Sequence, residues 1–179
     1  LDQGRPLQRE QVELVGIAAQ AVDAARAVGP DWPVRVEARH PVEVEGDAGR
    51  LRQVLDNLLA NARAHTPPGT SVVVRIGDEN GDAVIAVSDT GPGLAEGDAA
   101  RVFERFYRVD ASRSRQSGGA GLGLAIVQAI VAAHGGRVSL TTAPGEGATF
   151  TVRIPLNRAQ PNGSGPAPEG AVPAEPESA

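Results

Sequence analysis

A short apolar run that ends on an acid and a glycine turn constrains this chain more than any other stretch. Residues 83–88, Ala-Val-Ile-Ala-Val-Ser, are followed by Asp89-Thr-Gly-Pro-Gly93. Such a run predicts a buried strand that delivers the Asp89 carboxylate to the edge of the core. Gly91 and Gly93 lack a Cβ, so the backbone there can turn sharply and approach a bound ring. The stretch predicts a hydrogen-bond acceptor at the floor of a pocket, although an ordinary Asp-initiated turn would contain the same residues.

The composition limits the chemistry of that pocket. The chain of 179 residues has no cysteine and three histidines, which excludes disulfides, thiol chemistry and cysteine-ligated zinc. All 17 basic residues are arginine, so the lysine of a P-loop is absent. The net charge of -5 argues against nucleic acid as a partner. No apolar run reaches the ~18 residues of a membrane helix, so we expect no membrane-embedded segment.

The spacing of apolar residues predicts an order of helices and strands. Helices are expected at residues 12–28, 47–65 (with Asp47 as N-cap), 95–107 and 121–134. Strands are expected at residues 34–38, 42–44, 71–76, 83–88, 137–142 and 148–154. The first two would form a short antiparallel pair or be neighbours, and the other four would form two hairpins. This order predicts an α+β fold, a two-layer sandwich with helices on one face of a mixed, mostly antiparallel sheet.

Three segments are expected along the chain. Residues 1–10 fit the end of a preceding dimerisation or linker segment, and residues 11–156 fit one folded domain. Residues 157–179 are a Pro-, Gly- and Ala-rich tail that cannot bury enough apolar surface to order itself. The chain starts at Leu1 without a methionine, which suggests a piece of a longer protein.

Two asparagines could form one wall of the pocket. Asn57 and Asn61 are four residues apart, so they share one side of the predicted helix. An amide oxygen there could bind Mg²⁺, which prefers hard oxygen ligands. Taken alone, the pair is more typical of the polar border of an amphipathic helix.

Two further stretches could hold phosphate. Gly118-Gly-Ala-Gly-Leu-Gly123 opens the last predicted helix, where backbone N–H groups and the helix dipole attract anions. A glycine hinge would have a similar sequence. Phe103-Glu-Arg-Phe-Tyr-Arg108 could anchor a loop by its aromatic residues and direct Arg108 at a phosphate. For a single arginine in a polar loop, exposure to solvent is the simpler interpretation.

Together these stretches resemble, in order and spacing, the catalytic and ATP-binding domain of sensor histidine kinases, in the GHKL ATPase superfamily. Residues 57–62 look like the N box of that family, residues 89–94 the first glycine box and residues 103–108 the F box. Residues 119–124 resemble its second glycine box, and residues 145–150 its last glycine-Thr segment. The resemblance covers residues 12–156 and implies the Bergerat fold, a mixed sheet under three main helices.

The resemblance implies roles for single residues. Asn61 would bind Mg²⁺, Asp89 would accept a hydrogen bond from the adenine amine, and Arg108 would hold phosphate beneath a mobile lid. Ala64 stands where the family often has a basic residue, and Arg63 beside it is the candidate replacement. Thr149 would close the adenine end. The full implied nucleotide-binding set is Asn57, Asn61, Arg63, His65, Asp89, Gly91, Gly93, Arg108, Gly119, Gly121, Leu122, Gly123 and Thr149.

Two differences, one from related ATPases and one from full-length histidine kinases, narrow the implied reaction. Those that hydrolyse ATP have a glutamate near the position of Asn57, so an asparagine fits phosphoryl transfer to a protein better. None of His40, His65 and His134 has the context of the family's phosphoaccepting histidine, so the acceptor is expected on a separate dimerisation domain.

The resemblance thus implies a cytoplasmic, monomeric kinase piece of a membrane-anchored protein that serves a response regulator. The alternatives are a stand-alone GHKL ATPase, an anti-sigma-type serine kinase, or a nucleotide-binding regulatory module without transfer.

Overall fold

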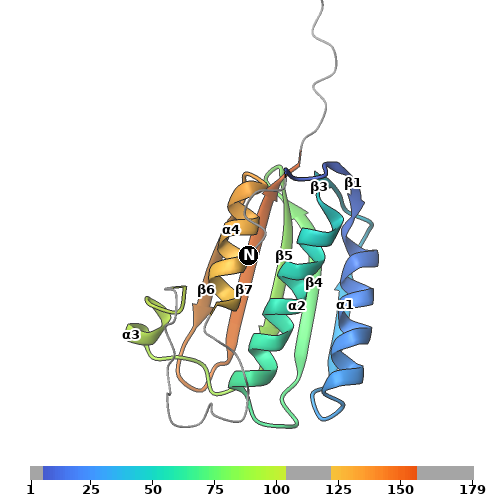
Figure 1. Ribbon diagram of the computed structural model, residues 1–179. Coiled ribbons are helices and arrows are strands. Elements are labelled where there is room, and N and C mark those ends of the chain that lie inside the picture. Colours follow the sequence, from blue (N-terminus) through green and yellow to red (C-terminus); the bar gives the residue numbers. More distant parts are fainter. Residues whose placement is uncertain (1–5, 104–121, 157–179) are drawn as a thin grey trace, which may run out of the picture.

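Five strands form the main sheet, in the spatial order β2-β4-β5-β7-β6 (Figure 1). The computed structural model describes residues 6–103 and 122–156. Strand β2 runs parallel to β4, and the other neighbours are antiparallel, so the sheet is mixed and mostly antiparallel as predicted. The strands are β2 (Val34–Ala38), β4 (Val72–Glu79), β5 (Asp82–Asp89), β6 (Arg137–Thr142) and β7 (Ala148–Pro155).

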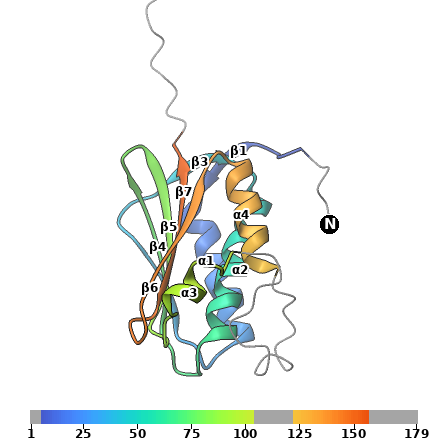
Figure 2. The same cartoon turned by 90° about the vertical axis from the view of Figure 1, so that its left-hand side faces the viewer.

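Three helices cover one face of this sheet, which confirms the predicted two-layer sandwich (Figure 2). They are α1 (Leu14–Val28), α2 (Ala48–His65) and α4 (Gly123–Ala133). Helix α2 lies between the other two, and its core-facing stripe is fully buried at Leu51, Val54, Leu55 and Leu58. In the described parts of the chain, no helix has both the length and the apolar character needed to cross a membrane.

A second, two-stranded sheet corrects the prediction for residues 34–44. Strand β3 (Glu43–Gly46) pairs antiparallel with β1 (Glu10–Glu13), and not with β2. The two segments expected to pair therefore belong to different sheets. Strand β1 also shortens the first predicted helix, which begins at Leu14 because the Glu13 side chain caps it, accepting from Val15 N–H at 2.7 Å. Alternating residues predicted the strands correctly, but their partners depend on tertiary packing.

The remaining element boundaries shift by a few residues. The first hairpin is longer than predicted: its turn is Asn80-Gly81, with φ of 53° and 85°. Two successive positive φ values fit the type I′ turn that matches the twist of a hairpin. Of the helix expected at residues 95–107, one turn, α3 (Glu96–Ala99), is present, and residues beyond 103 lie outside the described chain. The last helix begins at Gly123.

The ends of α2 and α4 that lie away from Asp89 meet at Asp47. Its Oδ1 accepts from Arg50 N–H at 3.0 Å, which confirms the predicted N-cap, and its Oδ2 accepts from Gln8 N–H at 3.1 Å. The Asp47 N–H donates to Nε2 of buried His134 at 3.0 Å. The His134 Nδ1–H then donates to Ile130 O at 2.8 Å, which requires the neutral ring. Asp47 thus connects the segment before β1, the start of α2 and the end of α4 through hydrogen bonds.

Loss of this cap should weaken the fold in a pH-dependent way. The hydrogen bonds from Arg50 and Gln8 lower the pKa of Asp47. A lowered folded-state pKa stabilises the fold above the unfolded value of about 3.9, and this stabilisation is lost as the pH falls through the folded value. Asp47→Ala should lower the free energy of unfolding by about 1–2 kcal/mol at pH 7, and by less at pH 3.

Urea unfolding at both pH values measures this difference. Asp47→Asn, which keeps a capping oxygen, is the matched control and should lose less. An equal loss of unfolding free energy for both variants at both pH values would show that the cap does not cause the destabilisation.

Candidate functional site

Asp89 is the last residue of β5 and faces the helices. Side chains alternate between the two faces of a strand, and Asp89 follows buried Ile85 and Val87 at intervals of two. Its Oδ1 accepts from Gly91 N–H at 2.9 Å, and it also accepts from the N–H of Ala148, its partner on β7. Burial raises the pKa of Asp89 against the opposing effect of these donors and of His65. The structure therefore holds a half-buried acceptor in a fixed orientation.

The turn after Asp89 is fixed by backbone contacts to the β6–β7 loop. Gly93 has a φ of 65°, and a Cβ there would collide with the carbonyl of Ala143. Gly147 has a φ of 75°, and its Cβ would collide with the carbonyl of Asp89. Gly145 N–H donates to Pro92 O at 2.7 Å between the same two segments. Only glycine fits at the two crossing points, so both glycines are required by packing as well as by conformation.

Helix α2 presents its polar side between Asp89 and the start of α4. Asn57, Asn61 and His65 recur at intervals of four and so lie along one side of the helix. His65 is near enough for its charge to lower the pKa of Asp89. At the other end of the row, a Cβ on Gly123 would lie 3.3 Å from Asn57 Oδ1. The structure thus places the Asp89 turn, Asn57 and Asn61 of α2, and Gly123 at the start of α4 in one row.

Two of the predicted residues point elsewhere. The Cδ of Arg63 lies 2.8 Å from where a Cβ of Gly29 would be, so Arg63 packs on the end of α1. Arg63 follows Asn61 by two positions, about 200° around the helix. Thr149 Oγ1 donates to Ser88 Oγ at 2.9 Å, and Ser88 lies on the sheet face opposite to that of Asp89. The structure does not bring these two side chains to the Asp89 carboxylate.

Of the Phe103–Arg108 and Gly118–Gly123 stretches, the structure describes only Phe103, Leu122 and Gly123. Leu122 precedes α4, and its carbonyl accepts from Ile126 N–H at 2.9 Å. Phe103 packs edge-on against Phe150 of β7, with ring centroids 6.1 Å apart, so the described end of the Phe103–Arg108 stretch is held by an aromatic contact as predicted. The predicted phosphate-binding residues Arg108, Gly119 and Gly121 lie outside the described chain.

Sequence reasoning missed two threonines that hold the Asp89 turn. Thr142 Oγ1 accepts from Leu94 N–H at 2.9 Å and donates to Gly147 O at 2.7 Å. Thr66 ends α2 and contacts Gly91. The sequence signal for Thr66 was its place directly before Pro67, where a helix usually ends.

Comparison with known families agrees with this geometry. Residues 46–158 match the family described as histidine kinase-, DNA gyrase B- and HSP90-like ATPase. The chain belongs to this ATPase family. ATP is therefore the nucleotide that the fold binds, as the sequence predicted.

Relatives of this ATPase family member include sensor kinases. The probable sensor histidine kinase TcrY of Mycobacterium tuberculosis is 48% identical over 168 residues, which cover 93% of this chain and 35% of TcrY. The sensor-like histidine kinase SenX3 of Mycolicibacterium smegmatis is 41% identical and covers 82% of this chain. The solved mycobacterial sensor histidine kinase MprB is 31% identical, with a TM-score of 0.72, and covers 82% of this chain and 97% of that structure. The chain spans about a third of the length of the first two relatives and corresponds to the ATP-binding part of such kinases.

The buried charge of Asp89 should lower the stability of this ATPase-family domain without nucleotide. Because burial raises the folded-state pKa of Asp89 above its unfolded value, wild-type stability should rise as the pH falls through the folded pKa. Asp89→Asn removes the charge but keeps an oxygen for Gly91 N–H. We therefore expect this variant to unfold at higher urea than wild type at pH 8.

The difference in urea midpoint should shrink as the pH approaches the unfolded value of about 3.9. Asp98→Asn, on α3, is the control. A variant less stable than wild type at pH 8 would contradict the burial argument.

Proposed function

We propose that this chain is the catalytic part of a sensor histidine kinase. It would bind ATP with Mg²⁺ and present the γ-phosphate to a histidine on a separate dimerisation domain. One observation carries the proposal: a half-buried acceptor, Asp89, lies at one end of a row of polar side chains, and the start of α4 lies at the other. Asn57 and His65, near the ends of that row, are about 12 Å apart along α2. A base at one end and phosphates at the other fit a nucleoside triphosphate.

The base end suits adenine. Asp89 is fixed by donors from Gly91 and Ala148, which leaves carboxylate lone pairs for an exocyclic amine. Gly91 has no side chain to separate the ring from the backbone. A similar solved structure, full-length ShkA, is described as a complex with AMPPNP; it is 33% identical, with a TM-score of 0.71.

The phosphate end suits Mg²⁺ held mainly by the nucleotide. In residues 6–103 and 122–156, no group of three His, Cys, Asp or Glu side chains could hold a metal by itself. Mg²⁺ keeps several waters and binds substrate phosphates, so one amide oxygen is a sufficient protein ligand. We assign that role to Asn61. Asn57 Nδ2 donates to Gln53 O at 2.9 Å, so its Oδ1 is oriented toward the start of α4.

The proposed reaction is phosphoryl transfer by positioning. A nitrogen lone pair of the acceptor imidazole forms the N–P bond, and the bond from the γ-phosphorus to the bridging oxygen breaks as ADP leaves. With an amide at position 57, the row has no carboxylate there to activate water. Catalysis would come from orientation and from neutralisation of phosphate charge, to which Arg108 and the Gly119–Gly123 backbone would contribute.

The domain limits and surroundings belong to the same proposal. The catalytic domain would comprise residues 11–156, which include all of β1 except its first residue, Glu10. It would lie in the cytoplasm as a monomer when isolated, beside the dimerisation domain of the same protein, with a response regulator as the next acceptor. TcrY and SenX3 are longer sensor kinases of which this chain spans about a third, and this supports the presence of a further domain in the same protein.

Removal of the proposed metal ligand should weaken ATP binding only when Mg²⁺ is present. Asn61→Ala should raise the Kd for ATP roughly tenfold in Mg²⁺ and little in EDTA, measured by calorimetry; one charge-assisted contact is worth about 1.5–3 kcal/mol. Gln20→Ala, an exposed amide on α1, is the control. An equal loss in Mg²⁺ and EDTA would place Asn61 away from the metal.

The direction of transfer can be tested with the acceptor domain added in trans. With γ-labelled ATP, we expect label on the added helical domain that is lost in acid and retained in base, as for phosphohistidine. Acid-stable label on a serine would favour the serine kinase instead. Sustained phosphate release without acceptor would favour an ATPase. Nucleotide binding with neither phosphoryl transfer nor phosphate release would favour a regulatory module.

A further inference from the structure

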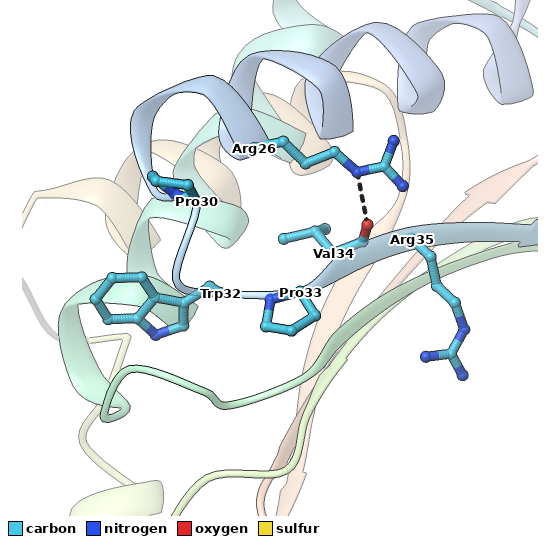
Figure 3. Close-up of a pocket in the computed structure, with 6 residues that line it drawn as sticks. All are labelled: Arg26, Pro30, Trp32, Pro33, Val34 and Arg35. Atoms are coloured by element: carbon cyan, nitrogen blue, oxygen red, sulfur yellow. Dashed lines mark hydrogen bonds between the residues drawn. The ribbon is translucent and has the colours of Figure 1, made fainter.

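The single tryptophan of the chain contacts the helix end beside Asp89. Trp32 lies at the rim of an open hollow of about 280 Å³, together with Pro30 and Pro33 (Figure 3). Its Nε1–H donates to Thr66 Oγ1 at 3.0 Å, and Thr66 Oγ1 donates to Ala62 O at 2.7 Å. The hydroxyl therefore has one donor and one acceptor as partners. This fixes the rotamer of Thr66, and with it the position of its methyl group.

That methyl group lies against the turn that holds the Asp89 carboxylate. A Cβ on Gly91 would lie 2.5 Å from Thr66 Cγ2 and 2.8 Å from Asp89 Oδ1. The Gly91 N–H donates to the same Oδ1 at 2.9 Å. Gly91 is thus enclosed by the threonine on one side and by the carboxylate that it orients on the other. A shift of Thr66 would move the Gly91 amide, and the Asp89 carboxylate with it.

The other end of this series of contacts is also fixed. The Cε3 of Trp32 lies 3.4 Å from where a Cβ of Gly29 would be, so the indole packs on the end of α1. Trp32 N–H donates to Gly29 O at 3.1 Å in the same turn. Both the backbone and the ring of Trp32 are therefore held in place, and its Nε1–H is a donor in a fixed position for Thr66.

We propose that Thr66 and Trp32 are positioning residues for base recognition by Asp89. The inference rests on the proposed function, in which Asp89 accepts from the adenine amine. Thr66 acts through Gly91, and Trp32 acts through Thr66. Together they set the direction of the carboxylate lone pairs, and this direction distinguishes adenine, which offers an amine donor, from guanine, which offers a carbonyl acceptor at the same position.

Substitutions at Thr66 separate the hydroxyl from the methyl group. Thr66→Val keeps the shape but removes both hydrogen bonds; Thr66→Ser keeps the hydroxyl but removes Cγ2. Calorimetry with ATP and with GTP gives the ratio of the two Kd values. Thr66→Val should weaken ATP roughly fivefold to tenfold, the loss expected for a hydrogen bond of ordinary strength, and leave GTP unchanged. Trp32→Phe, which removes the donor and part of the ring, should change the ratio in the same direction.

A double substitution tests the contact itself. Gly91→Ala alone should abolish ATP binding, because its Cβ meets Thr66 Cγ2. Adding Thr66→Ser removes that atom and should restore part of the affinity. Two independent effects would instead add, as they do for residues that do not touch.

The outcomes separate this inference from the proposed function. Wild-type ATP affinity and an unchanged ATP-to-GTP ratio in both Thr66→Val and Trp32→Phe would overturn the positioning role, while loss of binding in Asp89→Asn would still support the base site. A general loss for both nucleotides that follows the melting temperature would assign a structural role only and also overturn it. Full ATP binding by Asp89→Asn would reject the base assignment, and the positioning role with it.

Discussion

Strand β5 is paired along all eight of its residues, with β4 on one side and β7 on the other, and this double pairing fixes the face to which Asp89 points. Side chains alternate along a strand, so a slip of one residue would turn Asp89 to the open face of the sheet and Ser88 toward α2. The buried side chains of Ile85 and Val87 oppose such a slip, because it would expose them. The same apolar packing that stabilises the sheet therefore orients the acceptor.

The sequence predicted the parts of the fold that local patterns determine. Helix α2, its cap at Asp47 and both hairpins depend on residues close in the chain, so apolar spacing and turn residues were sufficient. The partners of β2 and β3 were predicted wrongly. Strand β2 pairs with β4, which begins 34 residues after Ala38, and no local feature of Val34–Ala38 specifies that parallel neighbour. The short strand β1 was missed because four residues at the start of a helix carry little periodicity.

For the candidate site, the sequence predicted the grouping better than the orientation of single residues. Gly123 approaches Asn57, and the resemblance had placed both in one nucleotide-binding set. The directions in which the Arg63 and Thr149 side chains point were not predicted. Thr149 faces Ser88 because of the register between β5 and β7, which is a tertiary property. The sequence did not indicate Thr66, because its role depends on Trp32 and Gly91, which are 34 residues before it and 25 residues after it in the chain.

The crossing of the Asp89 turn with the β6–β7 loop has a consequence for how this domain can diverge. At Gly93 and Gly147 the two segments meet backbone to backbone, so no side chain there can be exchanged to reshape the corner. Substitution at these positions can only break the crossing. Inherited variation around Asp89 must therefore come from residues near the glycines, while the path of the main chain stays the same.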